Sequence, residues 1–215
     1  MLTNLYIDGF NLYYRAVSDK PSLKWLDCRE LARTLLPDDT IQNIHYFTSP
    51  LISRPGEDGP REQQKQRRQL VYLEALRTIH GLTVHEGTFQ PLQNMRRLVG
   101  QPADSVLVHD VSEKKSDVNL ATRLIVDGCK GSYEQAAIVS EDSDFVEAIR
   151  AVRDELDLPV ILVNPSSRKS HEPVELRDVA TRVVRIRENH LQRSQLPDVV
   201  YDVKGHAVRK PPEWA

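Results

Sequence analysis

Short apolar runs alternate with longer amphipathic segments along most of the chain. Runs typical of buried or half-buried strands lie at 3–7, 41–49, 82–89, 106–111, 136–140, 159–165 and 183–186. Helical periodicity is found at 27–36, at 61–81, in the segment that begins at Ser116, and from about 143 to 156. Strands that alternate with helices favour a parallel sheet covered on both faces. The pattern therefore predicts an α/β fold, a three-layer α/β/α sandwich with a mainly parallel central sheet.

Capping and turn residues give the expected ends of several elements. Asp27 is suited to cap the first long helix, Glu30 completes a capping box, and Pro37 stops the helix. The segment 51–60 is rich in turn residues and is expected to be a mobile loop, and residues 90–105 are expected to be irregular. From Leu196 onward three prolines interrupt the chain. We expect a domain at 1–195 and an extended or disordered tail at 196–215.

Composition places the chain among ordinary globular proteins. It has 215 residues, of which 40% are hydrophobic and 28% charged, with a formal net charge of −2. Its two cysteines form no C-x-x-C pair, which argues against a disulfide framework or a cysteine zinc site. No apolar run is long enough to span a bilayer, and a strand begins at once at the N-terminus, so we expect a cytoplasmic protein without a membrane partner.

Several common catalytic motifs are missing from the sequence. It has no G-x-G-x-x-G after the first strand, no G-x-x-x-x-G-K-[ST] and no G-x-S-x-G. Phosphatases that use two aspartates spaced by two after the first strand are also disfavoured, because Phe10 stands where the second aspartate would be. Dinucleotide enzymes, P-loop enzymes and serine hydrolases are therefore unlikely classes for this chain.

Four aspartates follow strand-like runs or open helices in three distant segments: Asp8, Asp117, Asp142 and Asp144. The carboxyl ends of parallel strands meet at one edge of a sheet, where sites form. Four carboxylates gathered there would repel one another unless a cation lay among them, and hard oxygen ligands suit Mg²⁺ or Mn²⁺. Each aspartate taken alone also fits the simpler role of a helix cap, but capping needs only one acid in the sequence SEDSDF, which contains three.

Polar neighbours surround the four aspartates in the sequence. Asn11 and Ser140 are placed to support them by hydrogen bonds, and Lys114, Lys115 and Asn119 are candidate contacts for a phosphate. Glu141 is expected to face away from the site. Asp127 lies off the helical face of Asp117 and is expected either to be structural or to support the acids indirectly.

Other residues remain open between two roles. Tyr13 and Tyr14 could stack on a base or pack in the core. His109 with Asp110 could approach the site, although a structural role is the simpler reading, and 166–171 could be a phosphate-contacting or a flexible loop. Scattered basic clusters could hold a polyanion or be solvated helix faces.

The segments IDGFNLYY, KKSDVNLATRLIVD and AAIVSEDSDF together resemble NYN-domain proteins, in the bacterial DUF88/LabA-like branch of the PIN-like nuclease superfamily. The resemblance covers roughly residues 2–197. It implies a PIN-like α/β/α fold that cleaves RNA with Mg²⁺ or Mn²⁺, with Asp8, Asp117, Asp142 and Asp144 as the catalytic, metal-binding acids and Asn11 and Ser140 as their supports. Many relatives carry a further aspartate six residues after the position of Asp117, where this chain has Arg123, and glycine or asparagine where it has Glu141.

Two hypotheses follow from the sequence. The first is a metal-dependent endoribonuclease acting on single-stranded or structured RNA. The second is a PIN-like module with weak or no catalysis that binds RNA or a protein partner. A homodimer is possible in either case.

Overall fold

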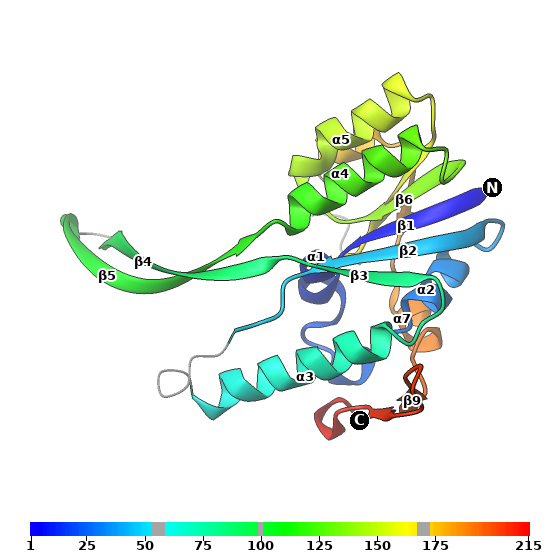
Figure 1. Ribbon diagram of the computed structural model, residues 1–215. Helices are drawn as coiled ribbons and strands as arrows, with labels where there is room; N and C mark the ends of the chain where they lie inside the picture. Colours follow the sequence, from blue (N-terminus) through cyan, green and yellow to red (C-terminus); the bar gives the residue numbers. More distant parts are fainter. Residues whose placement is uncertain (53–58, 99–100, 167–172) are drawn as a thin grey trace.

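The computed structural model describes residues 1–52, 59–98, 101–166 and 173–215. Its centre is a six-stranded sheet in the order β3-β2-β1-β6-β7-β8, in which every neighbouring pair is parallel (Figure 1). The strands of this sheet are β1 Leu2–Asp8, β2 Thr40–Thr48, β3 Leu82–Glu86, β6 Gln135–Val139, β7 Val160–Asn164 and β8 Arg182–Arg185. The predicted parallel α/β fold is confirmed.

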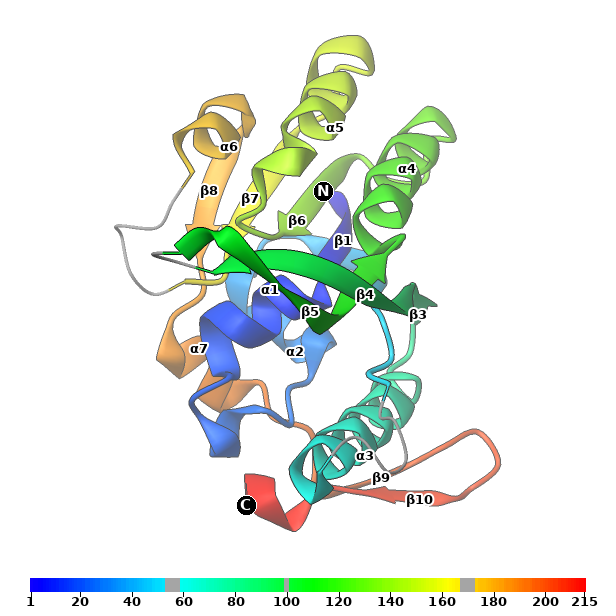
Figure 2. The ribbon, with the colours of Figure 1, turned by 90° about the vertical axis from the view of Figure 1, so that its left-hand side faces the viewer.

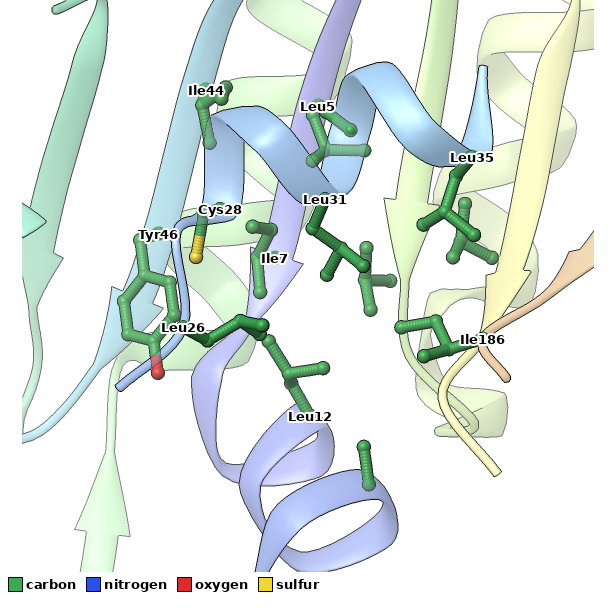
Figure 3. Close-up of a cluster of buried hydrophobic side chains, with 14 of the residues drawn as sticks. Leu5, Ile7, Leu12, Leu26, Cys28, Leu31, Leu35, Ile44, Tyr46 and Ile186 are labelled. Carbon is green, nitrogen blue, oxygen red and sulfur yellow. The ribbon is translucent and has the colours of Figure 1, made fainter. Parts of the chain in front are cut away.

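Helices cover both faces of the sheet, which gives the expected three layers (Figure 2). On one face lie α4 Ser116–Cys129, α5 Val146–Arg150 and α6 Val174–Val179. On the other lie α1 Gly9–Leu12, α2 Cys28–Leu35, α3 Pro60–Leu76 and α7 Glu188–Arg193. Side chains of β1 alternate between the two faces of the sheet and contribute to a hydrophobic core on each. Leu5 and Ile7 pack on one face and Tyr6 on the other. Figure 3 shows Leu5 and Ile7 against Leu31 of α2.

Local sequence explains where the helices begin. The Asp27 carboxylate accepts hydrogen bonds from the backbone N–H groups of Arg29 (2.8 Å) and Glu30 (3.0 Å), so it caps α2 as predicted. The helix expected at 61–81 ends earlier, at Leu76, and the chain turns into β3 at Gly81, whose φ of +70° suits glycine. The helix expected at 143–156 is a 3-10 turn, Ser143–Phe145, followed by α5 and a π-helical turn, Ala151–Glu155.

The strand predicted at 106–111 lies within β5 Gln101–Lys114, but the prediction of an irregular segment at 90–105 is wrong for the residues that the structure describes. β4 Thr88–Leu98 and β5 form a long antiparallel hairpin, with Thr88 opposite Lys114 and Arg97 opposite Ser105. The hairpin is a separate two-stranded sheet that projects away from the domain as an arm (Figure 1). A ribbon that packs against no core needs no apolar alternation, so its polar sequence has the pattern of a loop.

The expected tail at 196–215 is ordered and folds back on the domain. It forms the hairpin β9 Val199–Tyr201 and β10 Ala207–Arg209, followed by the 3-10 turn Pro212–Trp214. Trp214, only 7% exposed, packs with Trp25, Leu196 and Val208 in a small separate core against α3. Two of the three prolines that suggested an extended segment, Pro211 and Pro212, start that last turn. In the described part of the chain, no helix is long and apolar enough to cross a membrane.

The small core beneath the C-terminal segment predicts a measurable contribution to stability. Trp214 contacts the rings of Trp25 and Tyr72, at centroid distances of 6.2 Å and 6.1 Å. Trp214→Ala should therefore lower the free energy of unfolding by about 3 kcal/mol, measured by urea denaturation. Val203→Ala in the same segment is the control, since Val203 is 98% exposed. Equal stability of the two variants would contradict the packing described here.

Candidate functional site

The carboxyl end of β1 carries the first predicted acid, Asp8, which is 8% exposed. One carboxylate oxygen accepts a hydrogen bond from the backbone N–H of Asn11 (3.0 Å), and the other from the Ser140 hydroxyl (3.2 Å). The Asn11 side-chain oxygen in turn accepts the backbone N–H of Glu141 (3.1 Å). These bonds fix the carboxylate and join the ends of β1 and β6, which are neighbours in the sheet.

The turn after β6 carries two more of the acids. Ser140 Oγ accepts the backbone N–H of Asp142 (3.0 Å) while it donates to Asp8, and Asp142 Oδ1 accepts the backbone N–H of Asp144 (3.0 Å). Phe145, which is 1% exposed, anchors the turn in the core. Asp142 is therefore the cap of the 3-10 turn, and the same hydrogen bonds hold Asp144 beside it.

Asp117, in the first turn of α4, has a pKa that reflects the other carboxylates of the cluster. Partial burial, followed by the negative charges of Asp8, Glu113, Asp142 and Asp144, raises its pKa from the ordinary 3.8 to about 6. Burial also raises the pKa of Asp8, with smaller effects from Asp142 and Glu113 in the same direction. Carboxylates influence one another in this way only when they are close. The structure thus brings all four predicted aspartates to one edge of the sheet.

Glu113, at the end of β5, is an acid of this cluster that the sequence analysis missed. Its carboxylate accepts a hydrogen bond from the Ser49 hydroxyl (2.8 Å), which also lies 3.4 Å from the Ser116 hydroxyl. Ser49 directly follows β2, so a third strand end contributes to the site. Glu113 opens the same EKKSD segment as Asp117. Glu113 lies opposite Phe89 in the hairpin. The sequence predicted only a short strand at 106–111, which ends before Glu113, so this position could not be predicted.

The candidate phosphate contacts lie at the junction between β5 and α4. Lys114 and Lys115 are exposed, and within the described residues neither forms an ion pair. Lys115 has a φ of +83°, a left-handed conformation that is uncommon for a residue other than glycine. The backbone N–H of Asn119 bonds the Lys115 carbonyl (2.8 Å), so Asn119 lies one turn into α4.

Two departures noted in the sequence have structural explanations. Glu141 faces away from the acids, as expected, and forms an ion pair with Arg15 (3.1 Å). Arg123 forms an ion pair with the buried Asp127 (2.8 Å), four residues further along α4. Both pairs give a buried carboxylate a cationic partner.

Asp127 has the structural role expected of it. It also accepts a hydrogen bond from the Tyr6 hydroxyl (2.9 Å), and His45 Nε2 lies 3.4 Å from the same carboxylate. Burial lowers the pKa of His45 to about 4, so this ring is neutral at pH 7. It pairs with His85 (3.0 Å), a contact between histidines that sequence spacing did not reveal.

The remaining candidates fall in two groups. Tyr13 and Tyr14 are exposed, so they are not core residues. The side chains of His109 and Asp110, most of the 51–60 loop (53–58) and most of the 166–171 loop (167–171) lie outside what the structure describes.

The donor set of the cluster suits a hard cation. Every charged group in it is a carboxylate, and the raised pKa values of Asp8 and Asp117 record repulsion and burial that a divalent ion would relieve. Within the described residues, however, no three His, Cys, Asp or Glu side chains are arranged so that they could already hold an ion. The residue types fit Mg²⁺ or Mn²⁺, whereas ligation requires the side chains to move together.

Comparison with known proteins identifies the family. The model of the NYN domain matches residues 3–187. The chain belongs to the NYN-domain family. This family is part of a PIN-like nuclease superfamily, and the fold and the acidic strand edge agree with that placement.

Two individual proteins are similar to this NYN-domain chain. The 6-hydroxy-3-succinoylpyridine 3-monooxygenase HspA of Pseudomonas putida (strain DSM 28022 / S16) is 27% identical over 241 residues, covering 99% of this chain and 75% of the relative. The crystal structure of a protein of unknown function, VPA0982 from Vibrio parahaemolyticus RIMD 2210633, has a TM-score of 0.52 and 15% identity, covering 90% of this chain and 95% of that one. The second likeness concerns the fold alone.

The pKa of Asp117 predicts how stability depends on pH when no metal is present. Because the folded pKa, about 6, lies above the ordinary 3.8, the folded protein binds this proton more tightly than the unfolded chain. The contribution of Asp117 to stability should therefore fall as pH rises from about 4 to about 6. Asp117→Asn should raise the melting temperature at pH 7.5 in EDTA and reduce the loss of stability over that range.

Asp198→Asn is the matched control, since the Asp198 side chain is 86% exposed. Thermal melts at several pH values measure both variants. A lower melting temperature for Asp117→Asn at pH 7.5 would show that the favourable interaction of its charge with the α4 dipole outweighs the repulsion.

Proposed function

We propose that this NYN-domain protein is a metal-dependent endoribonuclease. The observation that carries the proposal is the convergence of five carboxylates, those of Asp8, Glu113, Asp117, Asp142 and Asp144, on one edge of the sheet, where each of the other four raises the pKa of Asp117. A scaffold gains nothing from such a cluster, because it destabilises the folded protein. A divalent cation bound among these carboxylates would offset their repulsion and could promote hydrolysis of a phosphodiester.

In this proposal the chain's own residues have distinct roles. Asp8, Asp117, Asp142 and Asp144 would hold Mg²⁺ or Mn²⁺, which supplies Lewis-acid polarisation of a phosphate and lowers the pKa of water. Ser140 and Asn11 keep Asp8 and the turn after β6 in register through the hydrogen bonds described above. Lys114, Lys115 and Asn119 would bind the phosphate backbone.

RNA is the proposed substrate for two structural reasons. The exposed rings of Tyr13 and Tyr14 follow directly from the Asp8 turn and offer faces for unpaired bases. Lys114 and Lys115 are exposed at the junction of β5 and α4, close in the sequence to Glu113 and Asp117. A strand of RNA that contacts both the tyrosines and the lysines would bring a phosphodiester to the carboxylates. The same surface without hydrolysis would be the RNA-binding module of the second hypothesis.

A different activity is favoured by one comparison. The name of HspA describes a monooxygenase acting on a substituted pyridine, and its similarity extends over 99% of this chain. Hydroxylation of a small heteroaromatic ring is therefore the second candidate function. It requires O₂ and a two-electron donor, so oxygen consumption that depends on a heteroaromatic substrate distinguishes it from phosphodiester hydrolysis.

Substitutions that replace a carboxylate by an uncharged amide of the same shape test the proposed ribonuclease activity. Asp8→Asn and Asp144→Asn should each reduce Mn²⁺-dependent cleavage of a labelled single-stranded RNA at least about a hundredfold, because each removes a proposed ligand. Asp198→Asn should cleave like the wild type, and EDTA should stop cleavage in all proteins. Full cleavage by both variants, with melting curves showing intact folds, would refute the assignment.

A separate prediction concerns Glu113. If it belongs to the working cluster, Glu113→Gln should slow cleavage at least about tenfold while it lowers the pKa of Asp117 by removing a neighbouring charge. In EDTA, the stability that Asp117 contributes should then be lost at lower pH than in the wild type, measured by thermal melts. The conservative change keeps an acceptor for the Ser49 hydroxyl. Cleavage and pH-dependent stability like those of the wild type would show that Glu113 only ties the hairpin to the domain.

A further inference from the structure

A cavity of about 350 Å³ opens on the face of the sheet that carries α1 and α3. Its floor is apolar and includes Leu12 and Leu26, which are buried. Aromatic rings form much of the wall, among them Tyr46, Tyr72 and Trp214. We call this cavity the aromatic pocket. Its size is that of a small-ligand site. Tyr13 and Tyr14, proposed above to stack on bases, line it too, whereas its buried floor and Trp214 have no role in the proposed hydrolysis.

The aromatic pocket adjoins the acidic site. Gly9 and Phe10, which follow Asp8 directly, line it, and Thr48, which precedes Ser49, lines it too. The Tyr46 phenol is close enough for the Asp8 charge to add to the rise of its pKa, which burial causes in the main. A side chain at Gly9 would meet the Tyr46 ring at 2.6 Å. The glycine therefore leaves room for this ring between the pocket and the acids.

Cationic groups accompany the aromatic walls. Lys24, Lys65 and Arg68 line the pocket, and no acid does so among the described residues. Lys24 lies over the Tyr13 ring, 5.3 Å from its centroid, which keeps its charge at the rim. Arg68 forms an ion pair with Glu213 (3.2 Å), beside Trp214, and Lys65 forms one with Glu62 (3.8 Å), but neither acid lines the pocket. The lining itself thus combines ring faces with cationic groups, opposite in sign to the acidic site beside it.

Part of the pocket comes from outside the family domain. The NYN match ends at residue 187, and Trp214 lies beyond it. The C-terminal segment reaches the pocket by packing on Trp25 and Tyr72 and by the pair between Arg68 and Glu213. A segment that merely stabilised α3 would not need to place an indole in the wall of a cavity.

We propose that the aromatic pocket binds a planar heteroaromatic ring that carries an anionic group, with the ring between the aromatic walls and the anion at Lys24, Lys65 and Arg68. Two sources share this chemistry: a nucleotide, in which a base carries a phosphate, and a free heteroaromatic carboxylate. The nucleotide source rests on the proposed function. If a nucleotide of an RNA chain bound in the pocket, the phosphodiester that joins it to the next nucleotide would lie at the acidic site. Binding of the ring itself requires neither metal nor hydrolysis.

Calorimetry in EDTA, with the full chain, tests the proposal independently of hydrolysis. The probes are uridine 5′-monophosphate and 6-hydroxynicotinate, each compared with its uncharged counterpart, uridine and 2-hydroxypyridine. At least one anionic probe should bind saturably, and its uncharged counterpart at least about fivefold more weakly. Binding of the first probe alone identifies the nucleotide source, and binding of the second alone the free acid. Because binding is measured in EDTA, where metal-dependent hydrolysis cannot occur, failure of the nuclease assignment would leave this result unchanged.

A matched pair of substitutions locates the binding. Ser18 lines the pocket, whereas the neighbouring Asp19 does not and is exposed. Ser18→Trp should fill the pocket and weaken binding at least about tenfold, and Asp19→Trp, with the same added bulk, should bind like the wild type. Melting curves confirm that both variants fold, and Lys24→Gln, which leaves the pocket open, should weaken the anionic probe alone. Absence of binding by both anionic probes, or binding unchanged in Ser18→Trp, would overturn the proposal.

Discussion

Electrostatic repulsion among carboxylates at the edge of the parallel sheet is the interaction that dominates the candidate site. Asp8 ends β1, Asp142 and Asp144 follow its neighbour β6, and Asp117 lies in the first turn of α4, which packs over β1 and β2. Hydrogen bonds from Ser140 and Asn11 hold Asp8 and the turn after β6 together despite their like charges. The cost appears as the raised pKa values of Asp8 and Asp117. The proposed function explains this destabilisation by a divalent cation that would bind among the carboxylates.

Basic residues near this negative cluster do not neutralise it, because they pair with other acids, remain exposed or line the aromatic pocket. Arg123, which stands where many relatives carry an acid, is paired with Asp127, and Arg15 is paired with Glu141. Lys114 and Lys115 stay exposed beside the acids, and Lys24, Lys65 and Arg68 line the aromatic pocket. A substrate with both aromatic rings and phosphates matches this arrangement of charges better than a purely anionic or purely apolar one does.

The sequence was sufficient for those parts of the fold whose side chains reach the core. Strand β6, wholly buried, and helix α2, capped by Asp27, were read from apolar runs and caps. The β4–β5 arm was missed because each of its strands pairs only with the other, so its residues show no core-facing alternation. The C-terminal segment was missed because its packing rests on a few distant contacts, chiefly between Trp214 and Trp25. Glu113 was missed for the same reason as the arm that carries it.

The four aspartates could be named from sequence because each follows a strand or opens a helix, but their distances from one another could not. A crystal soaked in Mn²⁺ and measured at the manganese absorption edge tests the central claim most directly. The account predicts an anomalous peak among Asp8, Asp117, Asp142 and Asp144, with these side chains drawn closer than in the metal-free structure. A saturated crystal with no peak at this position, or with its only manganese elsewhere, would contradict it.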